Sequence, residues 1–562
     1  MGVGLALALG PALASTALAA PPPAPPEEEN AGDGSGDGSD AATDAQLEAI
    51  QARLDALERE VDALRGERDE ARAALERVEA EVAETQTEAE RAAAEQAEAL
   101  EALEAPETAE ATPVGSVSDG QDQPNYADGF HFGSYGRVVA AGDLRGRPGR
   151  DGDIVARGSR FDESTYAELE MRREDYWEVT DSYTRIVTTV AFAHPIFHYD
   201  GQFDAKLAVR NLYIEELDLG AKGLSFWAGS RMYRGDDIYV LDWWPLDNLN
   251  TVGGGLGYQF KGGTFLKVHG GLQQPNDPFF VQNADRPLPL DQPGSATVDI
   301  LNRQKFVSSY KLGHVFGVGE TGGVKLVAYG ETHHVRAGQR EVDYREYEDL
   351  PDDHGFVAGG EVSLFTGERS THINLWVRHA WNLAAYGDLQ SPRQLAPDGT
   401  TQGARELIIA LGGNYEKKWF GLMGGAYFRR FRNASPDLDY ADLNEGIVLL
   451  RPQAWFGQVG GVALEGSYQL QRRGVLTGLD IGEQSGPITG GLGRVGVMPF
   501  WAPGGRGSYA RPHIRAMYML SVRDAGARSL YPQDHVLSLR PVDHFFGFGA
   551  EWWFGSTSYF RD

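Results

Sequence analysis

The chain has 562 residues, no cysteine, 71 glycines and a formal net charge of −30. The absence of cysteine excludes disulfides and thiol chemistry. Residues 21–127 contain 29 Asp and Glu against 7 Arg, a net charge of −22, so the other residues together carry only −8. This balance argues against nucleic acid as a partner and assigns the acidity mainly to an N-terminal extension.

The first residues predict an export signal. Residues 1–20 are uncharged, rich in Leu and Ala, and end in Ala17-Leu18-Ala19-Ala20, as a signal peptide does, although a basic start is missing. Residues 21–43 are rich in Pro, Gly, Asp and Glu and predict a disordered spacer. No later stretch reaches 18 uncharged apolar residues, so we expect no transmembrane helix. This criterion does not detect the strands of a membrane β-barrel, whose hydropathy signal is weak.

Residues 44–105 carry a heptad pattern. Mainly apolar residues recur every seven positions from Leu47 to Leu103, and a second series from Ile50 to Ala99 interleaves with it. This register predicts a coiled coil and oligomerisation of the following domain, with a solvated single helix as the alternative. Arg68 interrupts the first series and could set register or strand number. Residues 106–127 lack periodicity, contain prolines and predict a linker.

From residue 128 to 554, apolar and polar residues alternate in segment after segment. In 462–471, Val462, Leu464, Tyr468 and Leu470 share one face, and 372–378 and 514–522 behave likewise. Loops rich in Gly, Asp, Pro and Asn, such as 274–293 and 385–402, separate these segments. At roughly two dozen residues per strand and connection, the pattern predicts an all-β transmembrane barrel of 16 to 18 antiparallel strands, preceded by the α-helical coiled coil.

The last predicted strand, 543–554, has two different faces. One face is almost wholly aromatic and consists of Phe546, Phe548, Ala550, Trp552 and Phe554. The other face is mixed and consists of Phe545, Gly547, Gly549, Glu551 and Trp553. These faces suit a barrel wall between lipid and water. The edge strand of a soluble sandwich is the alternative, but it would expose an unusual amount of aromatic surface. Residues 555–562 would form a short tail.

No catalytic motif occurs. The sequence has no G-x-S-x-G elbow, P-loop or H-E-x-x-H, so we predict no enzyme activity, cofactor or metal site. His333-His334 is the tightest histidine cluster, and we interpret it as a pair at the end of a strand.

Seven short segments resemble, in their order and spacing, the maltoporin family of trimeric sugar-specific outer-membrane channels. They are 132–137, 159–161, 165–169, 210–215, 227–233, 237–242 and 511–515. The resemblance covers about 128–554 and implies an 18-stranded barrel with one loop folded into the pore. The preceding coiled coil is similar to the periplasmic extension of the related sucrose porins.

The resemblance also implies site residues. An aromatic lane, the greasy slide, would consist of Tyr135, Tyr166 and Trp553, on which the apolar face of a sugar ring can lie. A polar track beside it would bind the sugar hydroxyls: Arg137, Arg160, Glu168, Arg210, Asp237 and Asp242. Arg234 and Trp244 would form the constriction. Interface anchoring is the alternative role for the aromatic residues, and charge balance in the pore is the alternative for the ionic ones.

The chain departs from the family pattern at several positions. Gly235 stands where the family has a constriction arginine, and Trp244 stands at the position of the tyrosine that blocks the maltoporin constriction. No tryptophan precedes Arg451-Pro452, where a lower slide residue is expected. Phe197 or Tyr199 could supply the aromatic of a neighbouring subunit. These departures leave the identity of the sugar open.

The sequence thus predicts a passive, sugar-selective channel in the bacterial outer membrane. Its expected partners are oligosaccharides, two further copies in a homotrimer and outer-membrane lipid, with peptidoglycan or periplasmic proteins as candidates for the coiled coil. A general, weakly selective porin is the first alternative. A tether between the outer membrane and peptidoglycan is the second, and a barrel enzyme such as a lipase or protease is the third.

Overall fold

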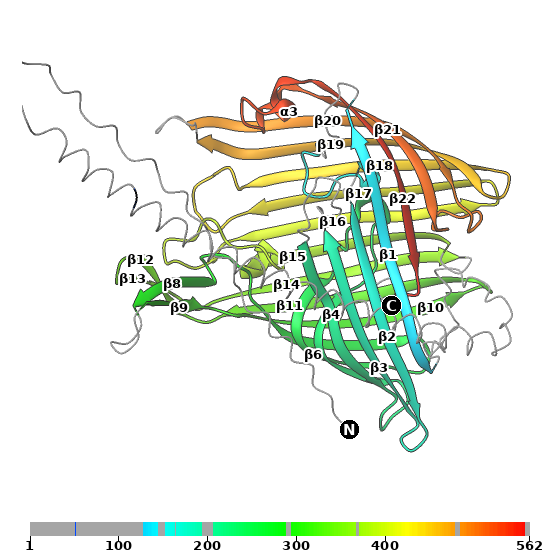
Figure 1. Cartoon of the computed structure of the whole chain (residues 1–562), viewed down its shortest axis with the longest axis horizontal. Coiled ribbons are helices and arrows are strands. Elements are labelled where there is room, and N and C mark those ends of the chain that lie inside the picture. The colour runs from blue at the N-terminus through cyan, green and yellow to red at the C-terminus, as the bar shows by residue number, and fades with distance from the viewer. Residues whose placement is uncertain are drawn as a thin grey trace, which may run out of the picture. The chain divides into compact units, whose positions relative to one another are not determined.

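The protein is described by a computed structural model at residues 51, 128–143, 152–162, 165–193, 206–287, 294–366, 370–477 and 484–556. Its main feature is a barrel of 18 antiparallel strands (Figure 1). In chain order the barrel strands are β1 (Gly129–Gly142), β2 (Tyr166–Trp177), β3 (Ser182–Ala193), β4 (Lys206–Leu217), β5 (Leu224–Arg234), β6 (Asn248–Gln259), β7 (Thr264–Gln273), β10 (Lys305–Val318), β11 (Gly322–Val335), β14 (Asp353–Thr366), β15 (Thr371–Asn382), β16 (Arg405–Lys417), β17 (Phe420–Arg432), β18 (Leu443–Phe456), β19 (Gly460–Thr477), β20 (Gln484–Trp501), β21 (His513–Arg523) and β22 (Val542–Phe554). The predicted barrel is confirmed.

The first and last strands close the barrel. β1 pairs with β2 on one side and with β22 on the other, so that Tyr135 lies opposite Glu168 and Trp553, and Arg137 lies opposite Tyr166 and Glu551. A closed sheet has no edge strand. This excludes the soluble-sandwich alternative, and it brings inward-facing residues from both ends of the barrel sequence into one patch.

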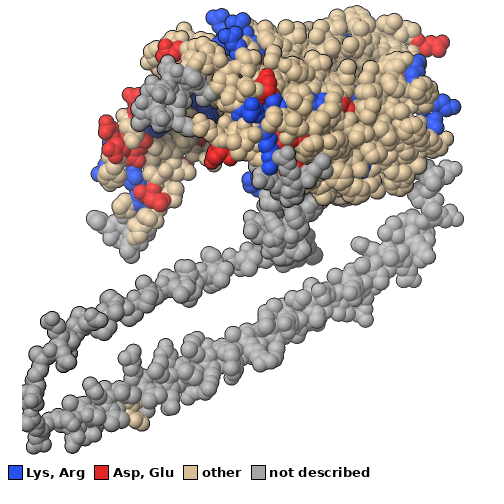
Figure 2. Space-filling view, turned by 90° about the horizontal axis from the view of Figure 1, so that it is seen from above, with Lys and Arg blue, Asp and Glu red and all other residues tan. Residues whose placement is uncertain are grey.

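The strands alternate between an apolar outer face and a polar inner face, as predicted. On β22, Phe546, Phe548 and Phe554 are exposed, whereas Phe545 and Glu551 are buried. The visible outer surface of the barrel is largely free of charged side chains (Figure 2). Charged residues turned into a water-filled or loop-filled interior can pair there, while apolar rows face lipid.

The connections alternate between long loops at one end and mostly short turns at the other. Two loops carry extra hairpins: β8 (Val281–Pro287) with β9 (Ser295–Asn302), and β12 (Gly338–Asp343) with β13 (Glu346–Leu350). These hairpins lie together at one end of the barrel (Figure 1), where acidic side chains also gather (Figure 2). The expectation that 274–293 is all loop is therefore wrong, because backbone pairing with β9 makes its 281–287 part a strand.

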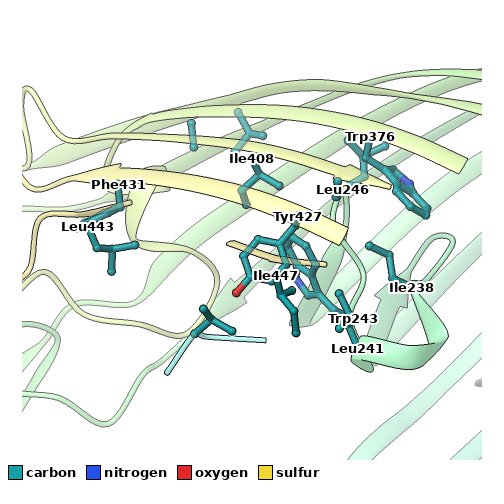
Figure 3. Packing of buried hydrophobic residues seen from close by; sticks show 14 of the residues in the cluster. Ile238, Leu241, Trp243, Leu246, Trp376, Ile408, Tyr427, Phe431, Leu443 and Ile447 are labelled. Carbon is teal, nitrogen blue, oxygen red and sulfur yellow. The ribbon is translucent and has the colours of Figure 1, made fainter. Parts of the chain in front are cut away.

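Segments from the long-loop end fold into the barrel. The β5–β6 loop, 235–247, contains the short helix η3 (Tyr239–Leu241), whose residues are all buried. Ile238, Leu241 and Trp243 join the largest apolar cluster with Trp376 and Tyr427 of the wall (Figure 3). The β1–β2 connection, with η1 (Arg160–Asp162), also enters the barrel. A third segment, 383–404, starts with η4 (Leu383–Tyr386), and the β21–β22 loop holds α2 (Ala525–Ser529) and α3 (Val536–Leu539).

Several sequence predictions lie outside the described residues. These are the signal peptide, the spacer, the linker, all of the coiled coil except Gln51, most of the C-terminal tail, and the candidates Phe197 and Tyr199. Within the ranges that the structure does describe, no helix has the length and apolar character needed to cross a bilayer. His333 and His334 lie near the end of β11, and the buried His333 ring lies 2.8 Å from the Glu331 carboxylate.

Candidate functional site

The loop 235–247 is fixed to the inner wall at both ends by ion pairs. Asp236 Oδ2 lies 2.7 Å from Lys325 Nζ on β11, and Asp247 Oδ2 lies 2.6 Å from Lys311 Nζ on β10. All four side chains are buried, so water does not weaken these attractions as it does at a surface. The two pairs therefore hold the loop inside the barrel.

The tip of the loop rests on strand glycines. A Cβ atom at Gly412 of β16 would lie 3.0 Å from Ile238, and a Cβ at Gly425 of β17 would lie 2.7 Å from Ile238 and 2.9 Å from Val240. Only a residue without a Cβ leaves room for such close packing. The loop 235–247 therefore lies against the inner wall, a position that the motifs alone did not reveal.

The two predicted slide tyrosines lie beside each other. The rings of Tyr135 on β1 and Tyr166 on β2 have centroids 5.9 Å apart. Arg137 donates to the Tyr135 hydroxyl at 3.0 Å, and its guanidinium lies 5.9 Å from the centre of the Tyr166 ring. Tyr135 and Arg137 therefore share the inner face of β1.

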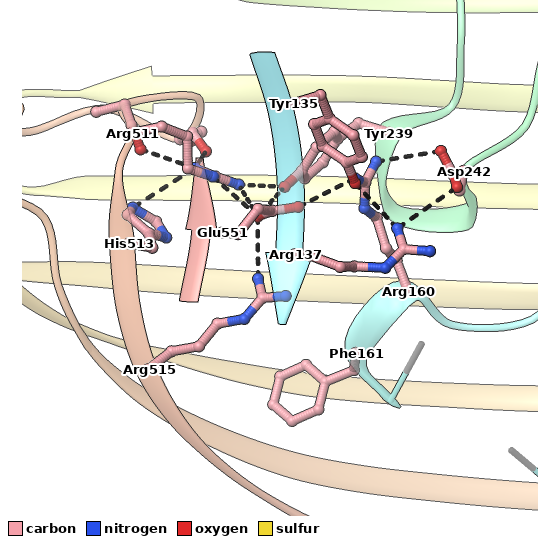
Figure 4. Close-up of polar contacts among 12 residues, drawn as sticks. Tyr135, Arg137, Arg160, Phe161, Tyr239, Asp242, Arg511, His513, Arg515 and Glu551 are labelled. Carbon is pink, nitrogen blue, oxygen red and sulfur yellow. Dashed lines mark hydrogen bonds and ion pairs between the residues drawn. The ribbon is translucent and has the colours of Figure 1, made fainter. Parts of the chain in front are cut away.

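Arg160 connects the loops to the wall (Figure 4). From η1 it donates to Asp242 at 3.2 Å, to Glu551 of β22 at 3.0 Å, and to the Tyr135 hydroxyl. Its guanidinium also lies 4.5 Å from the centre of the Tyr239 ring. Because these partners come from three segments, the strands β1 and β22 and the loop 235–247, Arg160 lies at the centre of the site.

Asp242 ends η3 in a left-handed conformation with φ of 45°. Burial raises the pKa of this carboxyl, but Arg160, Arg137 and Arg234 lower it more, so its pKa lies below the ordinary value. Arg137 contacts Asp242 at 3.7 Å, and the Asp242 side chain is 32% exposed. Asp242 is therefore an ionised acceptor that a solute in the lumen can reach.

Glu168 and Arg210 form the next part of the site. Arg210 of β4 donates to both the Tyr166 hydroxyl and the Glu168 carboxylate, and Tyr166 donates to Glu168. A cavity of about 530 Å³ borders Tyr166 and Arg210 and is also lined by Asn250 and Gln273. An aromatic ring and an ion pair thus stand together at the edge of open space.

The two predicted constriction residues are in contact. The Arg234 guanidinium lies 3.6 Å from the centre of the Trp244 ring and donates to the Asn248 side-chain oxygen at 2.8 Å. Asp237 lies in the same loop, half-buried, next to Asp236, which pairs with Lys325. Arg234 thus ends β5 just before the inward loop, and Trp244 lies within the loop, near its second end.

Trp553 faces the lumen, as its position in β22 predicts. Its ring meets Tyr239 edge-on at 6.0 Å, and the Arg511 guanidinium lies 4.1 Å from its centre. Tyr509 packs edge-on against Tyr239 at 5.4 Å. Arg511 and Tyr509 come from the connection 502–512, which therefore reaches the same site.

Sequence reasoning assigned no role to Tyr239, Tyr509 and Glu551. Glu551 is fully buried and accepts from Arg160, from Arg511 at 2.8 Å and from Arg515 at 3.0 Å. Its inward position could be read from the period of β22, but its partners could not. Tyr239 lay inside a quoted motif segment, with nothing local to distinguish it.

The assembled site combines aromatic faces with ionised hydrogen-bonding groups. An aromatic face can hold the apolar face of a sugar ring, and guanidinium and carboxylate groups can bind hydroxyls at its edge. Several weak contacts along a lumen allow a solute to move on after binding.

The comparison with protein families identifies a porin. The LamB porin family matches residues 130–554. No match was found among the curated proteins.

Among solved structures, OmpT, an outer membrane protein of Vibrio cholerae, is 14% identical with a TM-score of 0.35, over 76% of this chain and 99% of that one. OccAB1 of Acinetobacter baumannii is 9% identical with a TM-score of 0.40, over 78% and 100%. OccK10 (OpdN) of Pseudomonas aeruginosa is 11% identical with a TM-score of 0.34, over 76% and 100%. Because the family match runs from β1 to the end of β22, this chain belongs to the LamB porin family, the maltoporins of the outer membrane.

Proposed function

We propose that this porin is a passive, sugar-selective diffusion channel that works as a homotrimer. The observation that carries the proposal is the half-buried Tyr166 ring on the inner wall, which packs against the buried Tyr135 ring and is bordered by Arg137 and by the Glu168–Arg210 pair. Stacking on such rings recognises the faces of a sugar, and the ions recognise its edges.

In this proposal the slide consists of Tyr135, Tyr166 and Trp553. The polar track consists of Arg137, Arg160, Glu168, Arg210, Asp237 and Asp242, and Arg234 with Trp244 sets the narrowest part. The heptads of residues 44–105 would form a periplasmic coiled coil that supports the trimer. Net movement follows the solute gradient, so no cofactor or energy source is required.

Single-channel recording in planar bilayers tests the proposal. We expect conductance steps in groups of three that linear oligosaccharides block reversibly. Tyr166→Ala should weaken this block, because the stacking face beside Arg210 is lost. Tyr468→Ala is the matched control, since Tyr468 is exposed on the outer face of β19.

Two alternatives are separated by the same recordings. A general porin is favoured by Gly235 at the position of a family arginine, and it would show triplet steps that no sugar blocks. A tether to peptidoglycan is favoured by the heptad pattern, and a protein with only that role would give no steps.

A further inference from the structure

The site around the tyrosine rings contains more guanidinium groups than carboxylates. Asp242 is shared by Arg137 and Arg160, and Glu551 is shared by Arg160, Arg511 and Arg515. The guanidinium groups belong to Arg137, Arg160, Arg210, Arg234, Arg511 and Arg515. The carboxylates belong to Glu168, Asp237, Asp242 and Glu551. The local charge is therefore positive.

Other ion pairs inside the barrel do not repeat this excess of cations. Lys311 meets Asp247 at 2.6 Å, Arg451 meets Glu465 at 2.6 Å, and Lys325 faces two carboxylates, Asp236 and Glu361. Fixed charges that surround a narrow passage raise the local concentration of solutes of opposite charge. A net positive passage thus favours anions over neutral solutes of the same size.

Arg234 offers the best-placed group for such an anion. Its contacts are the neutral amide oxygen of Asn248 and the Trp244 ring, and no carboxylate of the described residues lies within ion-pair distance. A guanidinium stacked on an aromatic ring keeps its edge available for hydrogen bonds in the ring plane. That edge matches the two oxygens of a carboxylate or the oxygens of a sulfate.

We propose that the preferred solute is an acidic saccharide, whose anionic group binds Arg234 while its sugar rings pass over the tyrosines. This inference rests on the proposed function and adds the chemical class of the substrate. The nearby Arg210, 20% exposed, provides the next cationic position along the path. Successive cationic contacts let the anionic group transfer from one site to the next.

The test compares two oligosaccharides of equal length in bilayers containing the full-length protein: an oligogalacturonate and a neutral maltooligosaccharide. We expect the acidic one to block the current at a roughly tenfold lower concentration, as a charge-assisted hydrogen bond adds to the shared sugar contacts. The advantage should shrink as KCl increases, because salt screens the attraction.

Variants assign the effect to Arg234. Arg234→Gln should remove most of the preference for the acidic sugar, and Arg234→Lys should keep part of it. Arg173→Gln is the control, because Arg173 is 52% exposed and pairs with Asp175 away from the site. The open-channel steps of each variant show that it has folded and inserted.

The outcomes separate the two proposals. If neutral sugar blocks as well as or better than acidic sugar, and Tyr166→Ala weakens that block, the acidic class is wrong and the sugar channel stands. If Arg234→Gln keeps the full acidic preference, Arg234 is not the anion-binding residue. If neither sugar blocks, the sugar-selective function fails and this inference fails with it.

Discussion

Substituting Gly425 tests whether the loop 235–247 narrows the lumen by resting on the wall. A Cβ at Gly425 would lie 2.7 Å from Ile238 Cγ2, 2.9 Å from Val240 Cγ2 and 3.3 Å from Leu241 Cγ. Carbon atoms pack best at about 3.5–4.0 Å, so a valine would displace the loop by roughly 1 Å. Overpacking of this kind costs about 1–3 kcal/mol, which changes the ratio of seated to displaced loop about 5- to 150-fold.

We expect Gly425→Val to raise the single-channel conductance and the current noise, because a displaced loop opens the lumen and samples several positions. Planar-bilayer recording measures both quantities. Gly466→Val is the matched control, since Gly466 is exposed on β19 and nothing lies within 4 Å of its Cβ position. If both variants conduct like the wild type with the same noise, the packing argument for the loop is refuted.

Two further predictions concern other segments. Burial raises the pKa of Asp388 to about 6 from an ordinary value of 3.8, so the folded loop 383–404 favours the protonated carboxyl. Asp388 accepts a hydrogen bond from Asn250 and so connects this loop to the wall. The folded loop is therefore most stable below about pH 4 and becomes less stable as the pH rises to about 6. Amide protection of this loop should fall between pH 4 and pH 7 in the wild type and stay constant in Asp388→Asn; equal pH dependence in both would contradict the assignment. Deleting residues 21–127 should leave conduction intact, because β1 and β22 close the barrel within 129–554. Loss of all conductance steps would show that the extension is part of the channel, whereas loss of envelope anchoring alone would indicate a tether.

The strand faces could be predicted because the alternation of side chains depends only on the local backbone. Phe546 and Phe548 had to share a face wherever β22 lay, and the structure places both outside. The motifs likewise put Tyr135, Tyr166 and Trp553 on inward positions. Their mutual contacts follow from the register of β1 with β2 and β22, which antiparallel closure of the barrel supplies.

The resemblance implies that one loop folds into the pore, but which loop does so could not be predicted, because its position depends on residues remote in the chain. Ile238 and Val240 look like any short apolar run, and only Gly412 and Gly425 provide the space that receives them. Glu551 shows the same limit. Its inward direction follows from the strand period, whereas its arginine partners come from η1, the connection 502–512 and β21.

Lys325 shows how charge holds the loop in place. Its Nζ atom lies 2.7 Å from Asp236 of the loop and 3.2 Å from Glu361 of β14, and all three side chains are at most 5% exposed. Lys325→Met leaves two buried carboxylates without the cation that contacts both. Breaking a buried pair in this way costs about 3–5 kcal/mol, because the remaining charge stays out of water.

Glu361→Gln should be much milder, since it keeps the Lys325–Asp236 pair and removes only the second carboxylate. Urea unfolding in detergent, followed by tryptophan fluorescence, compares the midpoints of the two variants. The double variant Lys325→Met with Asp236→Asn should recover part of the loss, as expected when two residues act through one contact. Equal midpoint shifts for Lys325→Met and Glu361→Gln would mean that the lysine does not bridge the loop and the wall, and that the Lys311–Asp247 pair and the apolar packing on Gly412 and Gly425 keep the loop inside.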